Sequence, residues 1–500
     1  MIICILFTSF EEYLYSRLNK DFVISELIKR LNILEVEFTQ LKTDYVVLKK
    51  ASTQLQAENT ILKAKVSELE SRLKSNSSNS SKPPSSDGYQ KKPAFPKKTK
   101  GKKGGQKGHK GNNLHQVTNP DKIVKCVPDK CSCGHEFHQD ELSIAEKRQV
   151  FDLPQPKLEV TEYQIHKVNC PVCGLGNKGR APESIKAPTQ YGNGVKSYVV
   201  MLNVHYKLPY KKIQLLFKDL FGYSINESTI FSASQNCYNN LENTENKIKT
   251  KVSLNDVVHA DETGLRIEGK LQWLHTATTT LFTYLFVHKN RGKEALESES
   301  SILNRLNGWL VHDSWSSYFS FKNYKHAMCG AHILRELQGL VDIGKSKWAK
   351  TFKMFLMSVY EMPIDERIKR KQQIQDRFIR ICNIGEHMEP PPIKTKGKRG
   401  RYKRTKGRNL VERLIKYQDA VLAFAFYEQV PFTNNLAERD IRPAKIKQKI
   451  SNSFRSFKGA EYYARIEGFI STARKNNKNI FNELSTTFEG SNFITELAAK

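Results

Sequence analysis

The sequence predicts a multidomain α+β protein. We expect an N-terminal coiled coil, a small cysteine-rich module, a helical region and an α/β domain that carries a helical and basic insertion. Three features predict this order: leucines spaced seven residues apart near the N-terminus, two close cysteine pairs before residue 175, and strand-like segments after residue 255. A chain of 500 residues, 39% of them apolar, can bury more than one core, and we expect roughly three or four domains.

The composition is strongly basic. The chain has 81 Lys and Arg against 51 Asp and Glu, which gives a formal net charge of +30. An excess of this size indicates a polyanionic partner, nucleic acid above all, although a charge surplus that serves solubility would give the same composition.

The cysteines and the apolar segments bear on the compartment. Nine cysteines, an odd number with one tight cluster, suit a reduced compartment and a metal site better than a disulfide framework. The opening MIICILF is too short to span a bilayer and lacks a basic start, and no later segment reaches the length of a membrane span. We therefore expect a cytoplasmic protein with no membrane partner.

Residues 1–74 predict a leucine-zipper coiled coil. Apolar residues between 27 and 73 recur with alternating steps of four and three, and the polar Asn59 at a core position is typical of residues that fix register. This pattern predicts a homo-oligomer, and the alternative is a long helix packed against its own chain. The leucines of the repeat are Leu27, Leu34, Leu41, Leu48, Leu55, Leu62 and Leu69.

Residues 75–120 predict a disordered linker and a basic arm. The linker SNSSNSSKPPSSDG has no apolar side chain to bury. Nine lysines then lie between 91 and 110 without one acid, among glycines that allow close approach to phosphates. We interpret the arm as a DNA contact, with a solvated charged tail as the alternative. Its predicted contacts are Lys97, Lys98, Lys102, Lys103 and Lys107.

Residues 121–185 predict a zinc-finger-like module. Cys170 and Cys173 stand in a Cys-x-x-Cys-Gly sequence, whose glycine lets backbone amides turn toward the thiolates of a tetrahedral site. Cys131 and Cys133 form another pair that is one residue shorter. We expect these four to hold a structural Zn²⁺, and unmetallated buried thiols are the alternative. Other candidates for one ligand are Cys126, His135 and His138.

Residues 186–252 predict helices. Gly222 separates two runs with helical apolar periodicity, and the segment SINEST offers an N-cap for the second run. Two helices joined at a glycine turn resemble a helix-turn-helix that reads DNA. They are equally typical of plain helical scaffolding, so both interpretations stay open.

Residues 253–475 predict a ribonuclease-H-like α/β domain. Strand-like runs at 256–262, 270–279 and 281–288 precede a helix-like stretch and a fourth strand that begins at residue 308. In this order of elements the first and fourth strands lie side by side.

Aspartates end both of these strands. Asp261 follows the first strand and Asp313 the fourth, so we expect the two carboxylates to emerge next to one another. Neighbouring carboxylates raise each other's pKa unless a divalent cation neutralises them, and such hard oxygen ligands suit Mg²⁺ or Mn²⁺. Adjacent strand residues face opposite ways, so we expect Glu262 to point away and to cap a turn at Thr263 and Gly264.

A third acid, Glu438, lies in PFTNNLAERDIRP on a predicted helix that Thr433 or Asn434 can cap. With this segment, several motifs resemble the DDE transposases of insertion-sequence family sixty-six. They are HADETG, HDSWSSY, MCGAHILREL, FTNNLAERDIRP and FRSFKGAEYYARIEGFISTARKNNKNIFNEL, joined by GGQKGHKG, the cysteine pairs and the leucine-rich N-terminus. The resemblance therefore covers nearly the whole chain.

The resemblance implies a catalytic triad of Asp261, Asp313 and Glu438 that holds Mg²⁺ or Mn²⁺. It implies that further residues belong to the site or lie near it, and a packed structural histidine is the alternative for His332. These supporting and phosphate-contacting residues are Asn434, Asn435, Arg439, Arg442, His332 and Arg335.

The long stretch between the second and third acids predicts an insertion at about residues 340–410, helical to about residue 385. Its end, EPPPIKTKGKRGRYKRTKGR, carries nine basic residues between 394 and 408 and is interpreted as a second flexible DNA-contacting strip. Residues 476–500 are predicted to form a C-terminal element. The strip's predicted contacts are Arg399, Arg401 and Arg404.

The activity that the resemblance implies is metal-dependent cleavage of DNA at the ends of an insertion sequence, followed by transfer of the 3'-hydroxyl ends into target DNA. The expected partners are DNA, a second copy of the chain and companion proteins of the same element, in the bacterial cytoplasm at the nucleoid. The alternatives are a non-catalytic zipper and zinc-finger regulator that binds DNA, and a ribonuclease-H-like nuclease that performs no strand transfer.

Overall fold

The computed structural model divides into two compact units, one built around a long N-terminal helix and one that contains the sheets and the other helices. The structure describes residues 2–80, 113–128, 130–391 and 404–496. Most of the two predicted basic segments lies outside these ranges. The predicted DNA contacts outside the described residues are Lys97, Lys98, Lys102, Lys103, Lys107, Arg399 and Arg401.

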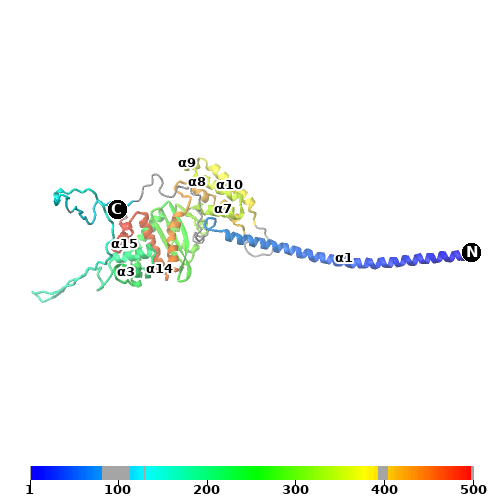
Figure 1. Cartoon of the computed structure of the whole chain (residues 1–500), viewed down its shortest axis with the longest axis horizontal. Helices are drawn as coiled ribbons and strands as arrows, with labels where there is room; N and C mark the ends of the chain where they lie inside the picture. The colour runs from blue at the N-terminus through cyan, green and yellow to red at the C-terminus, as the bar shows by residue number, and fades with distance from the viewer. Residues whose placement is uncertain (1, 81–112, 129, 392–403, 497–500) are drawn as a thin grey trace. The chain divides into compact units, whose positions relative to one another are not determined.

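Helix α1 (Ile2–Lys74) contains the whole predicted leucine repeat (Figure 1). Good helix formers such as Leu, Lys and Glu fill it, and no Pro or Gly interrupts it. Each leucine of the repeat is at least half exposed, from 50% at Leu69 to 70% at Leu48. The helix thus presents an apolar stripe along its length, and the pairing of two such helices remains a prediction.

A five-stranded mixed sheet forms the centre of the second unit, with strand order β5-β4-β3-β6-β7. Strands β3, β4 and β5 pair antiparallel, whereas β3 with β6 and β6 with β7 pair parallel. As predicted, the first and fourth strands of this region are neighbours. The strands are β3 (Val257–Ile267), β4 (Lys270–Thr278), β5 (Thr283–His288), β6 (Trp309–His312) and β7 (Lys325–Met328).

Strand β3 is longer than the sequence predicted. The expected end was residue 262 with a turn at Thr263 and Gly264, but β3 pairs with β4 as far as Ile267. The turn lies instead at Glu268 and Gly269, whose positive φ angles of 53° and 74° suit a two-residue hairpin loop. Asp261 therefore sits inside a strand, beyond the point where pairing with the shorter β6 ends.

Helices cover both faces of this sheet. On β5, Leu285 and Val287 pack in one core with helices α2, α3, α4, α14 and α15, while the alternating Tyr284 and Phe286 pack on the other side with α5. These helices are α2 (Asn193–Val200), α3 (Tyr210–Phe221), α4 (Glu227–Asn240), α5 (Glu242–Ser253), α14 (Phe457–Lys475) and α15 (Ile480–Phe488), with a short α16 (Phe493–Glu496).

The predicted helical region before the sheet is present. One π-helical turn, Met201–His205, follows α2. Gly222 ends α3 in the left-handed conformation with φ 74°, and Asn226 precedes α4. Since these helices share a core with α14 and the sheet, they serve at least as scaffolding.

The stretch between β7 and α13 (Asn435–Ser451) is helical and has a core of its own, in which Trp348, Phe352 and Phe378 are buried. The helices extend beyond the predicted limit near residue 385. They are α7 (Gly330–Gly344), α8 (Lys347–Glu361), α9 (Ile364–Lys369), α10 (Lys371–Met388), α11 (Lys406–Lys416) and α12 (Gln418–Phe426). A short α6 (Lys293–Glu297) precedes β6.

Candidate active site

The parallel pairing of β3 and β6 determines where the two aspartates lie. The register places His259 opposite Val311, so Asp261 and Asp313 each follow two residues later on neighbouring strands. Asp313 comes directly after the last residue of β6. Both carboxylates thus lie at the carboxyl end of a pair of parallel strands, where ligands bind in open α/β sheets.

The charges around Asp261 oppose its ionisation. Loss of solvation raises the pKa of its carboxyl well above the usual range, and the charges of Glu262, Asp313 and Glu438 raise it further. Burial also raises the pKa of Asp313, although the backbone amide of Trp315 donates a 2.8 Å hydrogen bond to its carboxylate and partly offsets this. A cation among these acids would relieve the repulsion.

Glu438 enters from helix α13, which packs against β3 and β4. Its position in the first turn is favourable for an acid because of the helix dipole. The preceding Asn434, only 1% exposed, donates a 2.7 Å hydrogen bond from its amide to the carbonyl of Ala260, and its Oδ1 lies 2.9 Å from His259 Nδ1. These bonds fasten the start of α13 to the strand immediately before Asp261.

The protonation of His259 supports this arrangement. Burial lowers its pKa to about 4, so the ring is neutral at physiological pH and its Nδ1–H donates to Asn434 Oδ1. Asn435, the next residue, is exposed, so of the two predicted supporting asparagines only Asn434 ties the helix to the sheet.

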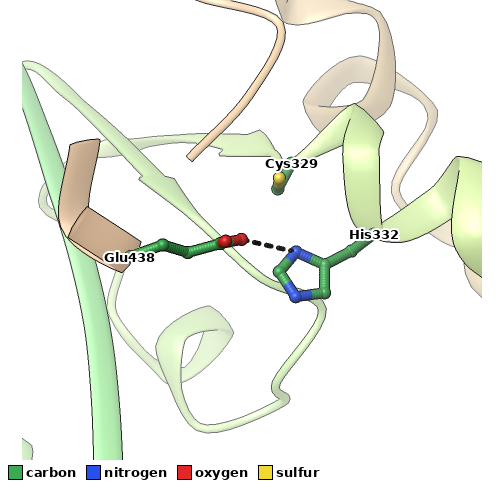
Figure 2. A group of neighbouring side chains, drawn as sticks. All are labelled: Cys329, His332 and Glu438. Carbon is green, nitrogen blue, oxygen red and sulfur yellow. Dashed lines mark ion pairs between the residues drawn. The ribbon is translucent and has the colours of Figure 1, made fainter. Parts of the chain in front are cut away.

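Two residues of α7 lie beside Glu438, as Figure 2 shows for His332. Glu438 Oε1 is 3.4 Å from Arg335 Nη2 and 3.8 Å from His332 Nδ1. Burial and the charges of Arg335 and Arg413 lower the pKa of His332 to about 3, so the histidine is neutral and Arg335 provides the positive charge next to Glu438.

Asp261, Asp313 and Glu438 lie near one another, but their carboxylate oxygens do not all come within 4.8 Å of one another. In the part of the chain that the structure describes, only Cys329, His332 and Glu438 bring three ligand atoms within 4.8 Å of one another. The donor set of Asp261, Asp313 and Glu438 nevertheless fits Mg²⁺ or Mn²⁺, because it consists of hard carboxylate oxygens whose charges raise the pKa of Asp261.

Glu262 does not cap a turn, contrary to prediction. Its side chain, 2% exposed, accepts hydrogen bonds from Arg291 at 2.6 and 3.0 Å and from the Tyr318 hydroxyl at 2.5 Å. The guanidinium of Arg291 also lies over the rings of Trp273 and Trp315, 4.9 and 4.5 Å from their centroids. Glu262 is therefore a buried acid with its own cation.

Another group that sequence reasoning missed holds α13 in place. Asp440, two residues after Glu438, accepts hydrogen bonds from Lys475 and Thr278 at 2.6 Å each and from Ser471 at 3.0 Å. The contacts join α13 to β4 and α14 in the protein interior. The acid in AERDIRP offered a signal, but its partners are too distant in the sequence to be identified from it.

The predicted DNA-contacting arginines within the described residues differ in their surroundings. Arg439 and Arg442 are exposed on α13, one helical turn apart. Arg404 forms an intramolecular ion pair with Glu412. Arg408, the end of the predicted flexible strip, is buried in α11 and bonded to Glu386 and Glu412, so its role is structural.

Each cysteine pair forms a tight loop. In the loop at the end of the hairpin β1 (Lys167–Asn169) and β2 (Gly176–Lys178), Cys170 N donates to Leu175 O, and Gly174 N, with φ 73°, donates to Cys170 O. At the first pair, Cys131 N donates to His135 O, and Gly134 N, with φ 94°, donates to Cys131 O. The first loop therefore repeats the second with one residue fewer.

Backbone and side-chain hydrogen bonds from Cys133 lower the pKa of the Cys131 thiol, and those from Cys173 and Val172 lower that of Cys170. Such loops suit zinc thiolates. The structure does not assemble a complete zinc site from them, since no three of the four predicted ligands lie within 4.8 Å of one another among the described residues.

Comparison with known protein families identifies the chain. The Transposase IS66 family matches residues 188–462, which include all three predicted catalytic acids. The chain belongs to the IS66 transposase family. The zinc-finger binding domain of transposase IS66 matches residues 128–174, with both cysteine pairs, and supports a structural zinc ion in this member. Cys126 lies outside that match.

The N-terminal part of this IS66 family member has a match as well. A family of unknown function (DUF6444) matches residues 25–115, which cover the whole leucine repeat and the basic arm. No curated protein matches the chain. Among the described helices, none combines the length and the apolar character needed to cross a membrane.

Proposed function

We propose that this protein is a DNA transposase that cleaves the ends of its insertion sequence and joins their 3'-hydroxyls to target DNA in a reaction that needs a divalent metal. The observation that carries the proposal is the placement of Asp261 and Asp313 on adjacent parallel strands, with Glu438 on a helix fastened to the first of them. The family membership supports the same conclusion.

The sheet topology supports a ribonuclease-H-like fold for this domain. Counted along the chain from β3, the strand order is 3-2-1-4-5, with the first three strands antiparallel and the last two parallel to the first. This order places the ends of the first and fourth strands together, which a site for divalent metals on two carboxylates requires.

Asp261, Asp313 and Glu438 would hold the Mg²⁺ or Mn²⁺ ions. When bound, such ions activate the attacking oxygen and stabilise the leaving oxygen of a phosphodiester. The protein holds the acids in place: Asn434 and Asp440 fix α13 against the sheet, and Arg335 balances the charge of Glu438. The exposed Arg439 and Arg442 are suited to phosphates that approach along α13.

The other parts of the chain bind DNA and bring protomers together in this proposal. The basic arm and strip would contact phosphates, and the zinc module and the helices around Gly222 would position the element's ends. The apolar stripe of α1 would pair two protomers, as joining two DNA ends requires. Companion proteins of the same element would act with the transposase, at the nucleoid of a bacterial cell.

The test is a reaction with DNA that carries the element's own ends, a target plasmid and Mg²⁺. The proposal expects cleaved ends and joined products that disappear when Mg²⁺ is removed. Cleavage without joining would identify a nuclease of the same fold. DNA binding with neither product would identify a regulator, and either result would contradict the proposal.

A further inference from the structure

A second set of ligands shares Glu438 with the three acids. Cys329 and His332, at the start of α7, point with Glu438 toward one another (Figure 2), and the Sγ, imidazole and carboxylate atoms lie within 4.8 Å of each other. The chemistry of this set differs from that of Asp261 and Asp313. A thiolate and an imidazole are ligands for zinc and similar cations rather than for magnesium.

The sulfur of Cys329 lies where backbone amides converge on it. Cys329 is the N-cap of the 15-residue helix α7. Its Sγ accepts a hydrogen bond from the amide of Asn434 at 3.2 Å, and the amides of Ala331 and His332 also interact with it. Burial nevertheless raises the pKa of the Cys329 thiol to about 11, and the amide donors offset this only in part, so a cation that binds here displaces the thiol proton.

The imidazole of His332 has an unused nitrogen. Its Nδ1 is inaccessible to solvent and has no hydrogen-bond partner among the described residues. The nearest acidic oxygen, Glu438 Oε1, is 3.8 Å away, beyond hydrogen-bonding distance. Buried polar atoms of this kind call for an explanation, and a cation between the nitrogen and the carboxylate would provide one.

We propose that Cys329, His332 and Glu438 form a binding site for a thiophilic divalent cation, above all Zn²⁺. The bound cation inhibits the enzyme. Three protein ligands leave the fourth tetrahedral position to water. The three ligand atoms lie within 4.8 Å of one another, so only small side-chain movements are needed to bring each of them to about 2.0 to 2.3 Å from a zinc ion held between them. A cation held here takes Glu438 away from Asp261 and Asp313, so the inhibition rests on the proposed function, whereas the binding site does not.

Binding is tested by adding Co²⁺ to the full-length protein and recording the sulfur-to-cobalt charge-transfer absorption. We compare wild type with Cys329→Ser, which keeps an acceptor for the amides, and with Cys382→Ser as control, because Cys382 is buried in α10 far along the chain from the site. The cysteine pairs of the zinc module contribute equally to all three proteins. We expect Cys329→Ser to bind one Co²⁺ per chain fewer than wild type and to lose the absorption of that ion, whereas Cys382→Ser should match wild type.

A further variant, His332→Asn, keeps the thiol and should weaken this Co²⁺ site at least about tenfold. If Cys329→Ser does not fold, His332→Asn decides the question by the same spectrum. Equal Co²⁺ binding by wild type and the folded site variants would overturn the proposed site.

Inhibition is tested by adding Zn²⁺ to the Mg²⁺-dependent DNA reaction and comparing each protein with its own zinc-free rate. Wild type and Cys382→Ser should lose about tenfold or more of their activity, while Cys329→Ser should lose far less. Equal inhibition of all three would contradict the regulatory role. A wild type that binds the extra Co²⁺ yet shows no reaction in Mg²⁺ would refute the proposed function and leave the metal site standing.

Discussion

The N-terminal region, up to residue 192, and the region that follows obtain their structure by different means. Among the side chains that the structure describes, every buried apolar residue lies at Val199 or beyond. The acids of the candidate active site are held by a sheet with cores on both faces, whereas the zipper leucines are exposed and no three of the four predicted zinc ligands lie within 4.8 Å of one another among the described residues. We therefore expect the later region to fold on its own and the earlier one to need a second chain and a metal.

The largest expected effect concerns the second chain. Replacing Leu41, Leu48 and Leu55 by Ala should weaken self-association by several kcal/mol, since each truncation of a buried leucine costs about 2 to 5 kcal/mol. Light scattering across a dilution series measures this. A molecular mass that is the same for wild type and the triple variant at every concentration would mean that α1 does not pair protomers.

The zinc module provides the next contrast. Cys170→Ser or Cys173→Ser should remove about one zinc ion per chain and unfold the module, because a tetrahedral site rarely survives the loss of a thiolate. Elemental analysis and limited proteolysis of residues 121–185 report on both. The main thermal transition should stay unchanged, since the core begins at Val199. Retained zinc in both variants would assign the ion to other ligands.

The next prediction concerns the electrostatics of Asp261, where a substitution should stabilise the protein by a smaller amount instead of weakening it. Its folded-state pKa is raised, so the charged carboxyl destabilises the metal-free protein above that pKa, and wild type gains stability as the pH falls from 7 toward the unfolded value near 4. In EDTA at pH 7, Asp261→Asn should therefore unfold with a free energy higher by about 1 kcal/mol. The difference should shrink at pH 5.

Urea unfolding at the two pH values measures this difference, with Asp256→Asn as a control, an exposed acid directly before β3 that lies outside the site. An Asp261→Asn variant less stable than wild type at pH 7 would show that the acids do not repel one another.

The smallest effect concerns phosphate contacts. Replacing Arg439 and Arg442 by Ala should lower the log-log salt slope of DNA binding by about 0.9 for each lost contact, with little change in sequence preference. Arg408→Ala should leave the slope unchanged, because Arg408 is bonded to Glu386 and Glu412. Salt titration of DNA binding decides between these outcomes, and equal slopes for all variants would place both α13 arginines outside the DNA interface.

The sequence predicted those parts of the fold that depend on local pattern. Apolar periodicity identified α1 and the strands, and the order of elements identified β3 and β6 as neighbours. The end of β3 was misplaced because the two-residue loop at Glu268 and Gly269 was not recognised as the hairpin turn. Strand β7 gave no apolar pattern, because its sequence KHAM begins with the polar Lys325 and His326, whereas β6 of the same length reads WLVH.

The candidate site was predictable only in part, because most of its bonds join distant segments. The motifs indicated Asn434 and Arg335 near Glu438, and the structure places them there. The binding of Glu262 by Arg291 joins a strand to a loop 29 residues later, and no local pattern indicates such a pair. The neighbouring position of Cys329 depends on α7 beginning directly after β7, which likewise only the fold reveals.

The most direct test of the central claim is the cleavage and joining of element-end DNA in Mg²⁺ by wild type, Asp261→Asn, Asp313→Asn and Glu438→Gln. Each variant keeps the shape of a side chain and removes a charge that metal binding requires, so each should lose both products while still binding DNA. Double variants should be no worse than single ones. Glu262→Gln, whose residue is paired with Arg291, should lose far less activity. Joined products from Asp261→Asn at the wild-type rate would contradict the account.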